Sequence, residues 1–193
     1  MKRLIPAALV LVSCTPLKSA FVRDDWAKDD APHVKRLAVV VQPLPDAKQK
    51  AGEAWARIAR RYVNQKRDFL VKKEVSQPTP VDLGAVCGGE DAIEGVLLIN
   101  PTLTAKGDGF EVEVQAVLQR CRDGREAWKA SAGGSFAAKD KLLVEVTQVY
   151  VQEFGEEVAP YVPPAMNVLR PLLDTLPQPV LTEADLDEKL TLD

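Results

Sequence analysis

The feature that most constrains the fold is an alternating stretch, FEVEVQAVLQ, at residues 110–119. Apolar residues fill every second position from Phe110 to Leu118, and mostly polar residues stand between them. Successive side chains of a β-strand point to opposite faces, so this pattern predicts a strand with one buried and one solvated face. A lone strand of this kind is not stable, and the chain is therefore expected to build a sheet around it.

Turn signals on both sides of this stretch predict which segments pair with it as neighbouring strands. A Gly107–Gly109 turn separates it from the apolar run IEGVLLI at 93–99, and Asp123-Gly124 predicts a hairpin into a segment with Trp128. The register of that hairpin stays open, because a one-residue bulge would move Trp128 to the opposite face.

The first half of the domain predicts a strand, a helix and a second strand. The run LAVVV at 37–41 is apolar without alternation, which is typical of a strand buried on both faces. A helix is expected over 47–66, with Asp46 as its cap, and a strand over 69–75. The helix is indicated by one stripe of apolar residues, which consists of Ala51, Trp55, Ile58 and Tyr62.

The C-terminal part predicts helices separated by prolines. Apolar residues at helical spacing indicate a helix over 140–158, which Pro160 and the next prolines are expected to stop. A short helix interrupted at Pro171 is expected within 165–176, and a weak capped helix within 182–190.

Together these elements predict an α+β (mixed α/β) fold. We expect a four- to five-stranded mixed sheet in the order β-α-β-β-β-β-α, with helices on one face, in a single domain at 36–176. Polar, irregular residues 14–35 are expected to form a tether, and residues 177–193 an acidic tail. An alternative remains for the tether, because its apolar residues could dock on the domain or on lipid headgroups; these are Phe21, Val22 and Trp26.

The N-terminus has the organisation of an export signal. Lys2 and Arg3 precede an uncharged apolar run of residues 4–12, which is too short to cross a bilayer. The sequence LVSC at residues 11–14 resembles the lipobox of bacterial lipoproteins. That resemblance implies removal of residues 1–13, a diacylglycerol thioether on Cys14 and a fatty acid such as palmitate on its new amine. The alternatives are a plain signal peptide and a buried N-terminal segment of a cytosolic protein.

The lipobox resemblance also implies a location. Lipoproteins retained in the inner membrane have Asp after the cysteine, whereas this chain has Thr15. We therefore expect a lipid anchor in the outer membrane, on its periplasmic face. Two or more acyl chains make such anchoring effectively permanent.

The other two cysteines suit an oxidising compartment. If the strand at 93–100 pairs with 110–120, Cys121 lies opposite residue 89 or its neighbours, which places Cys87 close by. We expect a Cys87–Cys121 disulfide, with two separate buried thiols as the alternative. Metal binding is not expected, because the single histidine, His33, lies in the predicted tether.

Two features are candidates for a partner surface. A helix face rich in Arg57, Arg60 and Arg61 is either a solvated surface or a site for anionic partners. The hairpin with Trp128, or a sheet edge, could bind another envelope protein.

Signals of catalysis are weak. Glu111 and Glu113 share a strand face and could act as a carboxylate pair, but a solvated strand face commonly has such residues. The Gly133-Gly134-Ser135 segment lacks the spacing of a phosphate loop. We expect neither an enzyme nor a cofactor.

The net charge argues against nucleic-acid binding. Removal of Lys2 and Arg3 leaves 23 basic residues of the original 25 against 28 acidic ones, a net charge of −5. Proteins that bind nucleic acids concentrate lysine and arginine instead.

Several of these segments also resemble a group of bacterial envelope lipoproteins. The resemblance covers residues 36–158 and rests on RLAVVVQPLP, AIEGVLLI and FEVEVQAVLQRCRDGREAWKASAGGS. The group includes curli-secretion-channel-like and TolB N-terminal-like domains, and lipoprotein activators of peptidoglycan synthases. This chain has no insert for membrane-spanning hairpins, so pore formation is not expected.

The functional expectation is a membrane-anchored periplasmic lipoprotein with a non-catalytic binding or assembly role and a protein partner in the envelope. A regulator of a peptidoglycan-synthesising enzyme and a hydrolase of envelope polymers are the alternatives.

Overall fold

The computed structural model describes residues 16–44, 49–78 and 80–192. Its strands are β1 (Leu17–Val22), β2 (Arg36–Val41), β3 (Leu70–Ser76), β4 (Gly95–Lys106), β5 (Gly109–Arg120) and β6 (Glu126–Ala137). Its α-helices are α1 (Gln49–Lys66), α2 (Leu83–Cys87), α3 (Val144–Phe154), α4 (Val162–Leu173) and α5 (Glu183–Lys189). Three shorter turns of helix are η1 (Trp26–Asp30), η2 (Lys141–Leu143) and η3 (Glu156–Tyr161). The predicted signal peptide, Cys14, Thr15 and the predicted cap Asp46 lie outside the described residues.

The strands form one mixed sheet in the order β1-β6-β5-β4-β2-β3. The pairs of β2 with β3 and with β4 are parallel, and the other three pairs are antiparallel. The α+β class is therefore confirmed, although the described sheet has six strands where four to five were predicted. The β4–β5 hairpin closes through a two-residue turn whose first residue, Gly107, has a φ of 60°, which glycine adopts without strain.

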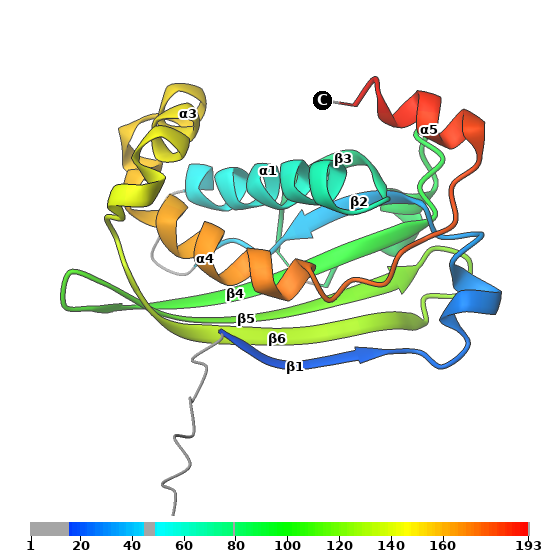
Figure 1. Ribbon diagram of the computed structural model, residues 1–193, viewed down its shortest axis with the longest axis horizontal. Coiled ribbons are helices and arrows are strands. Elements are labelled where there is room, and N and C mark those ends of the chain that lie inside the picture. The colour runs from blue at the N-terminus through cyan, green and yellow to red at the C-terminus, as the bar shows by residue number, and fades with distance from the viewer. Residues whose placement is uncertain (1–15, 45–48, 79, 193) are drawn as a thin grey trace, which may run out of the picture.

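One face of the sheet is covered by α1 and α4, which lie above the long strands in Figure 1, and α3 packs against these two helices. The even-numbered side chains of β5 from Val112 to Leu118 are buried on this side, as the alternation predicts. Trp55 of α1 is fully buried, and its indole Nε1 donates to the carbonyl of Tyr161 at 3.1 Å. The apolar stripe of α1 thus packs where the helical spacing indicates.

The opposite face is covered at one end only. Val86 of the short helix α2 packs there against Ala38, Val40 and Val96, and a disulfide lies beside this small cluster. The prediction of helices on one face is therefore incomplete. Toward β1 and β6 this face is open, and Phe21 of β1, Gln115 of β5 and Lys129 of β6 are exposed.

The segment predicted as a tether is largely part of the folded body. Leu17–Val22 pairs antiparallel with β6 as an edge strand, and the Trp26 indole donates to the carbonyl of Gln178 at 3.1 Å. Asp30 is fully buried and accepts from Arg120 at 2.7 Å. The alternative, docking of this segment on the domain, is the correct one for Trp26. The polar composition of β1 reflects an edge strand whose outer face is solvated.

The predicted acidic tail also packs against the domain. Thr182 and Asp185 form a capping box at the start of α5, as the sequence predicts for this helix. Asp185 is 3% exposed and accepts from Lys35 Nζ at 2.7 Å and from Arg36 Nη2 at 2.8 Å. The hydrogen bond from Lys35 holds the pKa of Asp185 well below its usual range.

The predicted helix over 140–158 is divided, and the next helix begins earlier than expected. Gly155, at a φ of 99°, ends α3 after Phe154. Pro163 and Pro164 start α4 instead of blocking a helix, because the first turn of a helix needs no backbone N–H donors.

Candidate functional site

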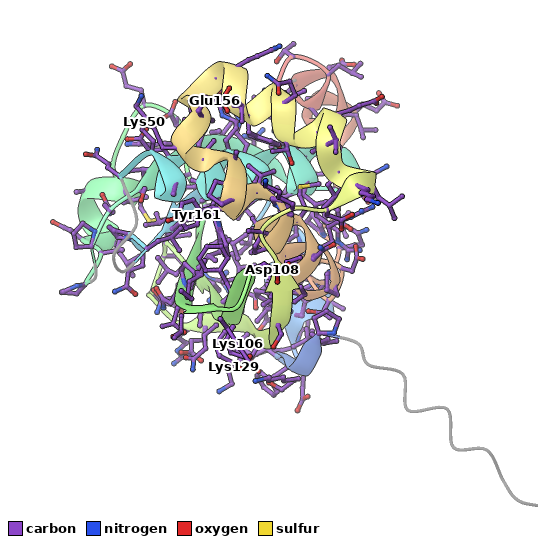
Figure 2. All side chains as sticks on the ribbon, turned by 90° about the vertical axis from the view of Figure 1, so that its left-hand side faces the viewer. Lys50, Lys106, Asp108, Lys129, Glu156 and Tyr161 are labelled. Atoms are coloured by element: carbon purple, nitrogen blue, oxygen red, sulfur yellow. A yellow bond between two sulfur atoms is a disulfide. The ribbon has the colours of Figure 1, made fainter. Side chains whose placement is uncertain are left out.

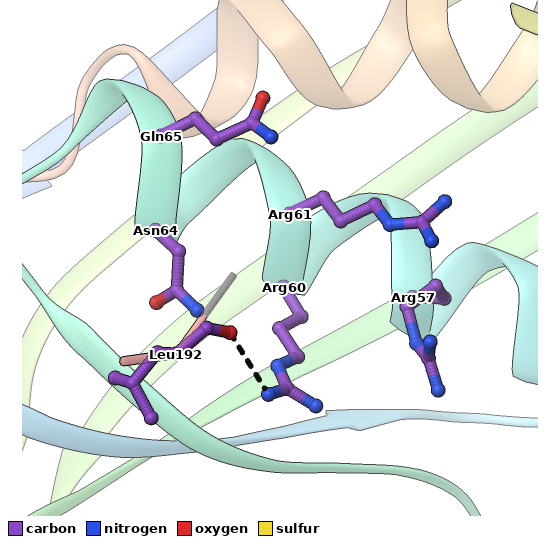
Figure 3. Close-up of a pocket in the computed structure, with 6 residues that line it drawn as sticks. All are labelled: Arg57, Arg60, Arg61, Asn64, Gln65 and Leu192. Carbon is purple, nitrogen blue, oxygen red and sulfur yellow. Dashed lines mark hydrogen bonds between the residues drawn. The ribbon is translucent and has the colours of Figure 1, made fainter. Parts of the chain in front are cut away.

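The three arginines of the predicted partner surface lie together on the outer side of α1 (Figure 3). Glu74 accepts from Arg57 at 2.5 Å and from Arg60 at 2.7 Å, and Glu153 accepts from Arg57 at 2.6 Å and from Arg61 at 3.2 Å. The three arginines line a pocket of about 180 Å³ together with Asn64, Gln65 and Leu192. Because two carboxylates already pair with the three guanidinium groups, this surface has little unbalanced positive charge.

Trp128, the other predicted partner residue, is a core residue. A bulge moves the pairing from Leu118–Trp128 to Gln119–Glu126, which places the indole on the helix-covered face. Its side chain is fully buried, and Nε1 donates to Thr175 Oγ1 at 3.2 Å. The prediction that Trp128 contributes to a partner surface is wrong, because the bulge that the sequence left open is present.

The two cysteines in the described residues form the predicted disulfide. It joins Cys87, the last residue of α2, to Cys121, which follows β5. The pairing differs in detail from the prediction, because Cys121 lies beside Glu94 and not residue 89; its N–H donates to the Glu94 carbonyl at 2.9 Å. The bond fixes α2 on the sheet. In the part of the chain that the structure describes, no three His, Cys, Asp or Glu residues are grouped to hold a metal.

Glu111 and Glu113 share a strand face as expected, but each has its own partner. Glu111 accepts from Lys106 at 2.7 Å and from Ser135 at 2.6 Å, and Glu113 pairs with Lys18. The hydrogen bonds from Lys106 and Ser135 lower the pKa of Glu111. A carboxyl that is held ionised in this way is poorly suited to act as a general acid.

A second hollow is a groove that the sequence did not indicate. It has a volume of about 700 Å³ and runs between α3 and the segment from η3 to the start of α4. One wall is a helical stripe of α3 at spacings of three, one and three residues: Val144, Thr147, Gln148 and Val151. The other wall is formed by Ala159, Pro160 and Pro163. Its floor is mainly apolar, which is typical of a surface that receives an apolar side chain or segment.

A large apolar side chain of the groove lining, Val144, is 62% exposed, and Leu142, two residues earlier in the chain, is 91% exposed. Val149 is 48% exposed, but its position on α3 turns it away from the groove stripe. Lys139 and Lys141 stand at one end of the groove, and both are exposed. Exposed apolar residues are common one at a time, whereas a cluster beside an apolar groove is typical of an interaction site.

The comparisons with known proteins give structural likeness only. No protein-family model and no curated protein matches the chain. It is similar to a PelC dodecamer from Paraburkholderia phytofirmans, with 13% identity and a TM-score of 0.47 over 84% of this chain and 96% of that chain. It is also similar to Lipoprotein GNA1162 from Neisseria meningitidis, with 17% identity and a TM-score of 0.38 over 62% of this chain and 96% of that chain.

A third solved structure is the LpoB C-terminal domain from Salmonella enterica, with 13% identity and a TM-score of 0.34 over 56% of this chain and 88% of that chain. A bacterial lipoprotein is thus among the structures that the chain is similar to. Likeness at this level supports no statement about binding or assembly. Across residues 16–44, 49–78 and 80–192, none of the helices combines the length and the apolar character needed to span a bilayer.

Proposed function

We propose that this chain is a lipoprotein anchored through Cys14 in the outer membrane, on its periplasmic face, that binds another envelope protein without catalysing a reaction. The observation that carries the binding role is the groove of about 700 Å³ beside α3, whose lining residue Val144 is exposed. An anchored domain that exposes such a surface is suited to hold a partner at the membrane.

The occupant that fits this groove is an apolar helical segment of a partner protein. The α3 stripe repeats at i, i+3, i+4 and i+7, which is the spacing that packs against a second amphipathic helix. The charged residues of the lining balance each other, because Lys139 and Lys141 are accompanied by Asp140 and Glu156. We therefore expect an amphipathic helix that is recognised mainly through its apolar side.

A non-catalytic role is supported by the state of the carboxylates. Glu111 and Glu113 each pair with a lysine, and the lowered pKa of Glu111 disfavours proton donation. Glu74 and Glu153 likewise balance two of the three arginine charges of α1.

The test is photo-cross-linking in cells. A photoreactive amino acid placed at Val144 is expected to capture a defined envelope protein, and the same group at exposed Lys66, at the far end of α1, is expected not to. The captured protein is then purified, and its Kd is measured for the wild type and for Val144→Asp. A charge in the apolar groove should weaken binding about tenfold or more.

The outcomes separate the candidate functions. Equal capture at Val144 and Lys66, or an unchanged Kd for Val144→Asp, would contradict docking in the groove. A captured peptidoglycan-synthesising enzyme would identify the chain as its regulator. Release of soluble fragments from purified envelope polymers by the wild-type protein would contradict the non-catalytic role.

A further inference from the structure

The folded body begins almost at the residue expected to carry the lipid. The carbonyl of Pro16 already accepts a hydrogen bond from the Gly133 N–H of β6, at 2.8 Å. Cys14 lies two residues before Pro16. Two residues span at most about 7 Å, whatever conformation they adopt. The lipid-bearing residue is therefore always close to the start of the folded body.

This short reach can be compared with the thickness of a bilayer surface. Each headgroup layer is about 5–8 Å thick, and a diacylglyceryl group places its glycerol at the inner boundary of that layer. A span of about 7 Å from Cys14 therefore keeps Pro16 within or directly above the headgroups. The N-terminal end of β1 must lie on the membrane.

From this reach we propose that the open sheet face of β1, β6 and β5 rests on the phospholipid headgroups of the membrane that holds the anchor. This inference rests on the proposed lipidation of Cys14. It adds an orientation, because it specifies which face meets lipid and which face meets the periplasm.

The two faces of β1 differ in what already covers them. On one side α4 packs against β6 and β1, so the helix-covered side of this edge is occupied. The other side has a shallow hollow of about 350 Å³ that includes Ser19, Phe21, Gln115, Lys129 and Ser131. In Figure 1, β1 is the lowest strand, and α1 and α4 lie above it. The open face is therefore the broad surface beside Pro16 that no helix covers.

The side chains of this open face suit a headgroup layer. Phe21 is 49% exposed, and the Lys129 ammonium lies 5.6 Å from the centre of its ring. An aromatic ring beside a lysine combines an apolar body with a charged end, as side chains at a membrane interface do. The hydroxyls of Ser19 and Ser131 lie 2.7 Å apart and can bond to phosphate or glycerol oxygens.

The charges on this face do not oppose contact with lipid. Its lysines pair with its glutamates in three pairs: Lys18 with Glu113, Lys106 with Glu111, and Lys129 with Glu126. Although the lipidated chain without residues 1–13 has a net charge of −5, this face is balanced, and anionic headgroups are not repelled by it. We expect contact with the bilayer to depend little on its anionic lipid content.

This orientation directs the α3 groove away from the membrane. Figure 2 shows Lys106 and Lys129 at the lower side of the molecule and Glu156, a residue of the groove, at the upper side. A lipid-facing sheet and a partner-facing groove thus occupy opposite sides of one small domain.

The test uses added tryptophans in the lipidated protein. The three native tryptophans are buried, so a tryptophan at an exposed site reports its own surroundings. Phe21→Trp places the probe on the open face, and Leu142→Trp places a matched probe beside the groove. Each protein is reconstituted in vesicles of phosphatidylethanolamine and phosphatidylglycerol that contain a phospholipid with a nitroxide on its headgroup.

The Phe21→Trp probe should lose about half or more of its added emission, and the Leu142→Trp probe should lose almost none. Equal quenching of both probes, or none at Phe21→Trp, would overturn the orientation while leaving the anchor in place. A spacer of 20 Gly and Ser residues inserted after Thr15 spans about 25 Å and should abolish the quenching. If the spacer left the quenching unchanged, the short distance between Cys14 and Pro16 would not be the cause of the membrane contact, and this part of the inference would be overturned.

Failure of the anchor itself is separately visible. If the protein isolated from cells has an unmodified Cys14, the proposed anchor is contradicted. Equal quenching of the two probes in the lipidated protein contradicts the orientation alone.

Discussion

The buried carboxylate of Asp185 should hold the C-terminal helix on the domain. The change is Asp185→Asn, which keeps the side-chain shape but removes the negative charge that faces Lys35 and Arg36. The amide has one acceptor oxygen where the carboxylate has two, so hydrogen bonds from Lys35, Arg36 or Thr182 are lost together with the charge. The matched control is Asp187→Asn, at an exposed position in the same helix.

The magnitude follows from the burial of the partners. Removing one member of a fully buried ion pair costs about 3–5 kcal/mol, and an exposed pair contributes about 0–1 kcal/mol. The Asp185 side chain is 4% exposed, but Lys35 and Arg36 retain 11% and 22% exposure and stay partly solvated. We therefore expect Asp185→Asn to lower the free energy of unfolding by about 2 kcal/mol and Asp187→Asn by less than about 0.5 kcal/mol.

The assay is chemical denaturation of both variants and the wild type at several pH values. Because the folded pKa of Asp185 is depressed, its stabilising contribution is complete above the unfolded pKa of about 3.9 and is lost as the pH falls toward the folded value. The difference between wild type and Asp185→Asn should therefore be largest at neutral pH and shrink in acid. Equal stability of the two variants at pH 7 would refute the reasoning.

Further predictions concern the disulfide, the core and the arginine surface. Replacing Cys87 and Cys121 with serine should cost about 3.5–4 kcal/mol, because the bond closes a loop with a sequence separation of 34; denaturation measures this, and a cost below about 1 kcal/mol would contradict it. Trp128→Ala should lower the free energy of unfolding by about 3–5 kcal/mol through the cavity it leaves. A variant that is as stable as the wild type but no longer binds the partner would contradict the core position of Trp128. Arg61→Ala should change stability by less than about 1 kcal/mol, since its pair with Glu153 is partly solvated; a larger loss by calorimetry would show that the pair is structural.

Local patterns in the sequence predicted much of the fold. The alternation from Phe110 to Leu118 and the apolar run at 37–41 both became strands with the expected buried sides. The Cys87–Cys121 bond could be predicted because strand pairing brings distant residues together. One signal is the periodicity of apolar residues, and the other is a pair of cysteines in a chain expected in an oxidising compartment. A single sequence is enough to show both.

Features set by tertiary packing were missed. The polar strand at 17–22 has no clear alternation and is held by its pairing with β6. A bulge that no residue type in the sequence indicates places Trp128 on the helix-covered face of the sheet. The α3 groove joins residues on α3 to Pro160 and Pro163, which read as helix breakers in the sequence.

The most direct test of the account is the intact mass of the protein extracted from bacterial membranes. We predict a chain that begins at Cys14 and is heavier than its residues by a diacylglyceryl group and an acyl chain. A chain that retains residues 1–13, or one with an unmodified Cys14, would contradict the proposed anchor and the orientation inferred from it.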